Sequence, residues 1–144
     1  MQFHHVGISV SSLEQSIAFY RDIMEMDLIA APFPLSGEEV EAVTALNNLK
    51  VQVCVLTKGN LMLEVFEFEN PAPKPQDPRY SVANHGITHF GVSVEDIDAT
   101  WSKLTERGVQ FHSSVRQFPS GVRAAYGRDP DGNVFELLEM PKRG

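Results

Sequence analysis

Residues 5–16 read HVGISVSSLEQS, and residues 89–100 read HFGVSVEDIDAT. The two stretches share His, Gly, Ser and Val at matched positions, and conservative pairs stand at five others. A second match follows later in each half, where residues 60–67 (NLMLEVFE) resemble residues 133–139 (NVFELLE). Two matches in the same order predict that the chain consists of two copies of one supersecondary unit.

The chain has 144 residues, which fits one compact domain or two half-size modules that share a core. We expect a first module at 1–70, a linker at 71–84 and a second module at 85–144. The linker is rich in proline, which fixes φ and removes backbone donors, so we expect neither a helix nor a central strand there. Its prolines are Pro71, Pro73, Pro75 and Pro78.

Each copy reads as a strand, a helix and then about three strands, which is an α+β class. Alternation predicts the first strand over residues 3–10, and a capping box of Ser11 and Glu14 starts the helix that follows it. Further strands are expected at 50–57 and 61–68, and at 122–128 and 133–140 with a DPDG turn between them. Pro32 and Pro34 indicate a loop, and residues 37–46 a short helix.

Alternation also predicts which histidine and glutamate side chains lie on the strand faces that the helices do not cover. If Val6 and Ile8 face the helix, then the preceding histidine lies on the other face, and the same argument holds for a glutamate later in each copy. The four residues found in this way are His5, Glu64, His89 and Glu136. A lone histidine on a strand is most often a packing or surface residue, and a lone glutamate is usually solvated. Four of them at repeat-equivalent positions favour a metal site.

Imidazole and carboxylate together suit divalent Fe, Mn, Co, Ni or Zn. Such a metal polarises a carbonyl or enediolate oxygen, and Glu136 or Glu64 could then move a proton at the neighbouring carbon. Met62, Phe66 and Leu138 share the predicted cavity face, which indicates a partly apolar organic substrate.

Several other residues have two readings. Arg123 or Arg128 could hold an anionic substrate group through bidentate contacts, or either could lie on the surface. Cys54, the single cysteine, could line the cavity or be a small buried side chain. The sequence places His4 on the helix side or the rim. It places Glu67 and Glu139 at a helix-side rim or in solvent.

Composition excludes several classes of protein. The formal net charge is −7, which is unfavourable for binding nucleic acid or an anionic membrane, because both need a cationic face. One cysteine rules out an internal disulfide, and no apolar run approaches the length of a membrane helix. We expect a cytoplasmic protein that binds a small molecule.

The motifs at these positions resemble a known family. The stretches that begin at His5 and His89, together with FYRD at 19–22 and DPDGNVFE at 129–136, are similar to the vicinal oxygen chelate superfamily over essentially the whole chain. That group includes glyoxalases, epimerases, extradiol dioxygenases and resistance proteins. The resemblance implies paired βαβββ modules that form a U-shaped mixed-sheet cup around one divalent metal, with helices on the outer face.

The resemblance also implies the ligands His5, Glu64, His89 and Glu136, and we expect a homodimer. A Glu or Gln at the position of Glu64 is typical of the lyase and epimerase branches, so the resemblance favours a metal-dependent lyase or isomerase. Residues 45–49 (ALNNL) lack the additional glutamate that similar epimerases carry. An extradiol-type dioxygenase and a metal-free binding or resistance protein are the alternatives.

Overall fold

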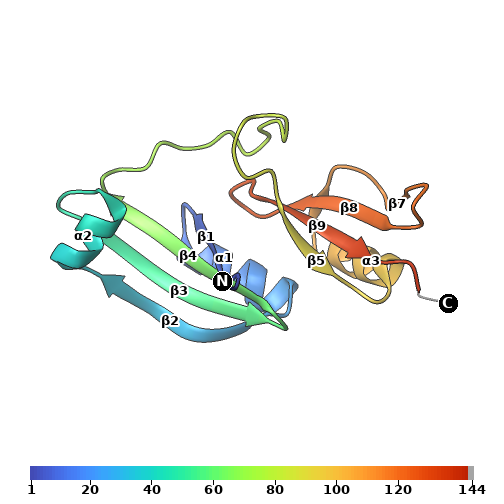
Figure 1. Cartoon of the computed structure of the whole chain (residues 1–144), viewed down its shortest axis with the longest axis horizontal. Coiled ribbons are helices and arrows are strands. Elements are labelled where there is room, and N and C mark those ends of the chain that lie inside the picture. The colour runs from blue at the N-terminus through green and yellow to red at the C-terminus, as the bar shows by residue number, and fades with distance from the viewer. Residues whose placement is uncertain (143–144) are drawn as a thin grey trace. The chain divides into compact units, whose positions relative to one another are not determined.

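The computed structural model describes residues 1–142, which divide into two units. Unit 1 is Met1–Pro75, and unit 2 begins at Gln76. The division therefore falls inside the proline-rich linker. Each unit has a mixed sheet of its own with helices packed on it, so the predicted α+β class is confirmed (Figure 1).

Unit 1 contains a four-stranded sheet in the order β1-β4-β3-β2. The elements are β1 (Val6–Ser9), α1 (Leu13–Ile17), the π-helical turn η1 (Ala18–Ile23), β2 (Asp27–Leu35), α2 (Glu38–Thr44), β3 (Lys50–Lys58) and β4 (Leu61–Asn70). β1 runs parallel to β4, and the other pairs are antiparallel. The face toward α1 carries the core, where Leu56, Leu63 and Val65 are fully buried.

The helix of unit 1 starts one residue later than the predicted capping box. Ser12 is the N-cap, and its Oγ accepts a hydrogen bond from the amide of Gln15 at 3.3 Å. The amide of Leu13 is bonded instead by Glu67 of β4, whose Oε2 accepts at 2.7 Å. The capping box of Ser11 and Glu14 was therefore wrong, because a carboxylate from the sheet supplies the second cap.

The loop predicted at Pro32 and Pro34 was also wrong, since both prolines lie inside β2. β2 pairs only with β3, so it is an edge strand. An edge strand tolerates proline because the missing donor faces away from the ladder. The ladder shifts register between Ala30 and Phe33, on either side of the first proline.

Unit 2 repeats the plan with strand order β5-β9-β8-β6, and β7 pairs with β8. The elements are β5 (Phe90–Ser93), α3 (Ile97–Glu106), β6 (Gln110–Phe111), β7 (Arg116–Gln117), β8 (Arg123–Arg128) and β9 (Val134–Glu139). β5 is parallel to β9, as β1 is to β4. Asp96 caps α3 by accepting from the amide of Ala99 at 2.9 Å. The internal repeat is thus a repeat of structure.

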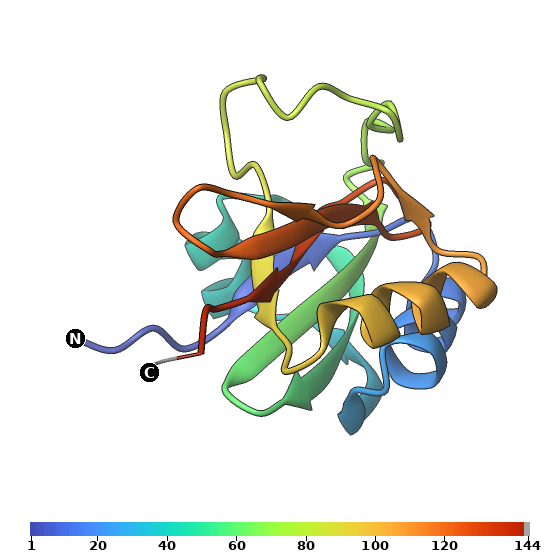
Figure 2. The ribbon, with the colours of Figure 1, turned by 90° about the vertical axis from the view of Figure 1, so that its right-hand side faces the viewer.

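The connection between β4 and β5 contains neither helix nor strand (Figure 2). Its second half is held to unit 2. Gly132, in the turn before β9, has a φ of +88°, and a Cβ there would lie 2.5 Å from the backbone of Pro78. Arg128 donates from Nη2 to the carbonyl of Tyr80 at 2.7 Å, and its guanidinium lies 4.9 Å from the centre of that ring.

Among residues 1–142, no helix is long and apolar enough to cross a membrane.

Candidate metal centre

The parallel pairing of β1 with β4 brings together the two predicted ligands of unit 1. His5 immediately precedes β1, and Gly7 of β1 pairs with Glu64 of β4. His5 Nε2 lies 3.4 Å from Glu64 Oε2, and the two side chains are 40% and 31% exposed. A Cβ at Gly7 would lie 3.4 Å from the ring of Phe66, so the glycine leaves room for that ring on this face.

Unit 2 contains the same pair on the same framework. His89 immediately precedes β5, and Gly91 pairs with Glu136 of β9. His89 Nε2 lies 3.3 Å from Glu136 Oε2, and the side chains are 26% and 17% exposed. The repeat therefore places one imidazole nitrogen beside one carboxylate in each unit.

The second nitrogen of each imidazole is held by the preceding residue. His5 Nδ1 lies 2.8 Å from His4 Nδ1, and His89 Nδ1 lies 2.8 Å from Thr88 Oγ1. Metal-binding histidines typically hydrogen-bond through the nitrogen that does not face the metal, because this bond fixes the ring and its tautomer. The sequence prediction left out these two partners, although a polar side chain directly before each repeated histidine was the available signal.

The donor atoms fit a divalent metal, because neutral imidazole nitrogen and carboxylate oxygen are ligands of Fe, Mn, Co, Ni and Zn. Each pair lies within one unit, and nowhere in residues 1–142 do three or more His, Cys, Asp or Glu side chains gather as a metal site. The structure thus brings together His5 with Glu64 and His89 with Glu136. A four-ligand site remains a prediction that requires the two pairs to meet.

Three of the four predicted substrate residues lie on the predicted face. Met62 and Phe66 alternate with Glu64 along β4, and Phe66 stacks on Phe68 at a ring distance of 5.9 Å. Leu138 alternates with Glu136 along β9. All three are partly exposed, so each unit offers apolar surface beside its His–Glu pair.

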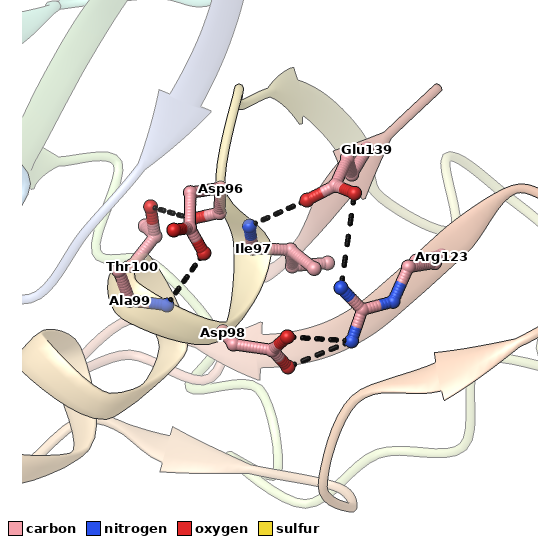
Figure 3. A network of polar contacts seen from close by, with 7 residues as sticks. All are labelled: Asp96, Ile97, Asp98, Ala99, Thr100, Arg123 and Glu139. Carbon is pink, nitrogen blue, oxygen red and sulfur yellow. Dashed lines mark hydrogen bonds and ion pairs between the residues drawn. The ribbon is translucent and has the colours of Figure 1, made fainter. Parts of the chain in front are cut away.

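The fourth, Arg123, lies on the opposite face of its sheet, where it pairs in register with Glu139. Its Nη2 contacts both oxygens of Asp98 at 2.7 and 2.8 Å, and its Nη1 lies 3.7 Å from Glu139 (Figure 3). The hydrogen bond to Asp98 raises the pKa of Arg123 above its usual value. Arg123 ties β8 to the start of α3, and this position gives no support to a substrate contact beside Glu136.

Glu139 also closes the start of α3, because its Oε2 accepts from the amide of Ile97 at 2.8 Å (Figure 3). This contact repeats the bond between Glu67 and Leu13 in unit 1. A cavity of about 700 Å³ lies beside this network and is lined by residues of the loop before α3 and the end of β9. Neither His89 nor Glu136 lines it.

Cys54 does not line the open face of its sheet. It pairs with Val65 on the side that packs against α1, and it is fully buried. Burial raises the pKa of its thiol to about 11. The reading of Cys54 as a small buried side chain is therefore the one that the structure supports.

Three residues lie beside the His89–Glu136 pair of unit 2 and were not predicted as a group: Tyr126, His112 and Arg128. Tyr126 of β8 pairs with Glu136, its ring lies 4.6 Å from that of His89, and its Oη lies 3.5 Å from His89 Nε2. Burial, together with the charge of Glu136, raises the pKa of Tyr126. His112 lies 6.0 Å beyond Tyr126, and its Nε2 accepts from Arg128 Nε at 2.9 Å. Alternation along β8 was the available signal, since Tyr126 and Arg128 share a face.

The duplicated His–Glu framework agrees with the similarity to known proteins. The sequence model of the Glyoxalase/Bleomycin resistance protein/Dioxygenase superfamily matches residues 2–137. The chain belongs to this superfamily. A glyoxalase family protein from Bacillus cereus has a crystal structure with a TM-score of 0.84 and 26% identity, over 96% of this chain and 93% of that one.

Two curated relatives match this chain over nearly its whole length. The uncharacterized protein YaeR of Escherichia coli is 30% identical over 140 residues, which cover 96% of each chain. A probable lactoylglutathione lyase of Synechocystis is 25% identical over 140 residues, covering 96% of this chain and 95% of the relative. The proteins similar to this chain include a probable lyase and a metallothiol transferase.

Proposed function

We propose that the protein is a divalent-metal-dependent lyase or isomerase that moves a proton at the carbon next to a carbonyl group. The single observation that carries this proposal is the twofold occurrence of one arrangement. In each unit a histidine presents Nε2 to a glutamate while its Nδ1 is held by the preceding side chain. The probable lactoylglutathione lyase among the relatives supports the same class of reaction.

In this proposal the metal is held by His5, Glu64, His89 and Glu136, which requires the two pairs to meet within one chain or between two chains of a homodimer. When bound, the metal supplies Lewis acidity to the carbonyl oxygen of the substrate. An ionised carboxylate on a face with apolar neighbours is costly without a cation, which gives Glu64 and Glu136 a reason to be ligands.

The remaining steps fall to the side chains of the chain itself. Met62, Phe66 and Leu138 contact the apolar part of the substrate and exclude water from the reacting carbon. Glu64 or Glu136 accepts the proton from that carbon and returns it to the neighbouring one, which is general base and then general acid catalysis. Both are on central strands, so their positions are fixed before the substrate binds.

The test is metal content together with turnover. Protein purified without chelator, or loaded with Mn²⁺, Ni²⁺ or Zn²⁺, should hold a stoichiometric metal, and His89→Ala and Glu64→Ala should lose most of it. Glu106→Ala, an exposed residue of α3, is the matched control. The hemithioacetal of methylglyoxal and glutathione is the first substrate to assay. Full metal content in both ligand variants would refute the proposal, and light scattering reports the oligomeric state.

A further inference from the structure

The open face of unit 2 carries a row of side chains that starts at the His89–Glu136 pair. Glu136 of β9 pairs with Tyr126 of β8, and the backbone amide of His112 donates to the carbonyl of Tyr126 at 2.8 Å. The ring of Tyr126 lies 4.6 Å from His89 and 6.0 Å from His112. His112, at the far end of the row, is exposed.

Arg128 fixes which nitrogen of His112 carries the proton. A guanidinium has only donors, so when Arg128 Nε donates to His112 Nε2 at 2.9 Å, that nitrogen must be the acceptor. The neutral ring then carries its hydrogen on Nδ1. Partial desolvation of the ring, together with the charge of Arg128, lowers the pKa of His112, which favours the neutral form.

The charge of Arg128 has no acidic partner in the described part of the chain. Its Nη1 and Nη2 donate to the carbonyls of Gly132 and Tyr80, at 2.8 and 2.7 Å, and its guanidinium lies over the Tyr80 ring. All these partners are uncharged. The cationic guanidinium therefore lies at the Nε2 edge of the His112 ring, where its charge favours an anionic ligand over a neutral one.

We propose that His112 is a substrate-binding residue whose Nδ1–H donates to an anionic oxygen group, a carboxylate or a phosphate, at the end of the substrate remote from the His89–Glu136 pair. Arg128 is the positioning residue, because its Nε donates to His112 Nε2 and thereby sets the tautomer of the ring. The placement of the carbonyl end rests on the proposed function, whereas the anion site at His112 does not.

The order of these side chains along the face also restricts which substrates can contact both ends. Tyr126 lies between the two ends, so the substrate must pass over or along its ring before reaching His112. A carbonyl compound whose acidic group is separated from the carbonyl by a short carbon chain meets this requirement. A compound with oxygens at one end only would leave His112 without a partner.

The first measurement needs no metal. Nitrogen NMR of His112 in the full-length, metal-free chain at pH 7.5 should show the Nδ1–H tautomer, and Arg128→Met should remove that preference. Titration with acetate or inorganic phosphate should shift the Nδ1 resonance. A wild-type ring that is protonated, or that carries its proton on Nε2, overturns the proposal, and so does the absence of any shift with both anions.

The second measurement uses matched ligand pairs and Mn²⁺-loaded protein in calorimetry. The carboxylate pair is 2-oxoglutarate against 2-oxopentanoate, and the phosphate pair is dihydroxyacetone phosphate against dihydroxyacetone. A hydrogen bond to a charged group corresponds to a preference of roughly tenfold or more for the anionic member of one pair. His112→Ala should abolish this preference, and His112→Asn, which places a donor near the Nδ1 position, should keep part of it.

Gln110→Ala, an exposed change on the same face of β6, should leave the preference unchanged. A preference that survives in His112→Ala overturns the proposal even if the metal binds as expected. If the protein takes up no Mn²⁺, the proposed function is refuted. The NMR measurement then tests the anion site at His112 separately. The ligand pair for which the anionic member binds more tightly shows whether His112 binds a carboxylate or a phosphate.

Discussion

Replacing Glu139 by alanine should destabilise the protein through the start of α3. Ile97 is fully buried, and its amide donates to Glu139 Oε2 at 2.8 Å. Truncation leaves this buried donor without an acceptor, and it removes a negative charge from the end of a helix that favours one. Arg123 keeps its contact with Asp98 in this variant. Asp98 is 64% exposed, so this ion pair contributes little to stability.

The two losses set the expected size of the effect. A buried donor left unsatisfied costs about 1–3 kcal/mol, and the charge at the helix start contributes about 0.3–1 kcal/mol. We expect Glu139→Ala to lower the free energy of unfolding by about 2 kcal/mol. The entropy of unfolding of a chain this long is about 0.3 kcal/mol per kelvin, so the Tm should fall by about 7 °C. Glu139→Gln keeps an oxygen acceptor and should lower the Tm by about 2 °C.

The assay is thermal unfolding followed by circular dichroism, with urea unfolding as a second measurement. Glu106→Ala removes an exposed glutamate from the same helix and is the control. Glu67→Ala removes the equivalent contact to Leu13 in unit 1 and should act in the same direction. If Glu139→Ala and Glu106→Ala unfold within about a degree of each other, the carboxylate does not cap the helix as argued.

Three other changes test separate features. Thr88→Val should weaken metal affinity by roughly 10- to 100-fold, because the bond to the following histidine is lost, while Thr105→Val should not; equal affinities would count against the role of Thr88. Cys54, with its pKa raised to about 11, keeps its proton after the unfolded thiol loses it near pH 9. Between these values the wild type should lose about 1.4 kcal/mol of stability per pH unit more than Cys54→Ala, as measured by urea unfolding, and parallel pH profiles would contradict this. Gly132→Ala should destabilise by more than about 1 kcal/mol and increase proteolysis of the linker, because its Cβ meets the backbone of Pro78; an unchanged digestion rate would show that the linker is not held there.

The repeat, and the strand faces on which the two histidines and the two glutamates lie, could be predicted from sequence because both follow from alternation and from spacing along the chain. Once Val6 and Ile8 are assigned to the buried face, the position of His5 is determined, and parallel pairing with β4 places Glu64 beside it. These are short-range regularities that each copy repeats. A site that joins the two pairs would depend on contacts between the units, and no local pattern of the sequence predicts such contacts.

The features that the sequence does not reveal depend on a neighbouring strand or helix. Pro32 and Pro34 read as a loop because sequence does not reveal that β2 lies at the edge of its sheet. Glu67 and Glu139 reach helix starts more than 40 residues away in the chain, so no capping motif within the helix shows them. The tautomer of His112 likewise depends on Arg128, which lies on another strand.

The two prolines of β2 also restrict how unit 1 can be extended by another strand. Proline in an edge strand occupies a position whose amide would face away from the neighbouring strand, so both missing amide hydrogens belong to the side of β2 that faces away from β3. An incoming strand that pairs with this side of β2 would lack the backbone donors of the two prolines. Strand addition and fibre-like stacking are therefore unfavourable there. The other edge strand of this sheet is β1, the strand that His5 immediately precedes, and it contains no proline, so its backbone donors are all present.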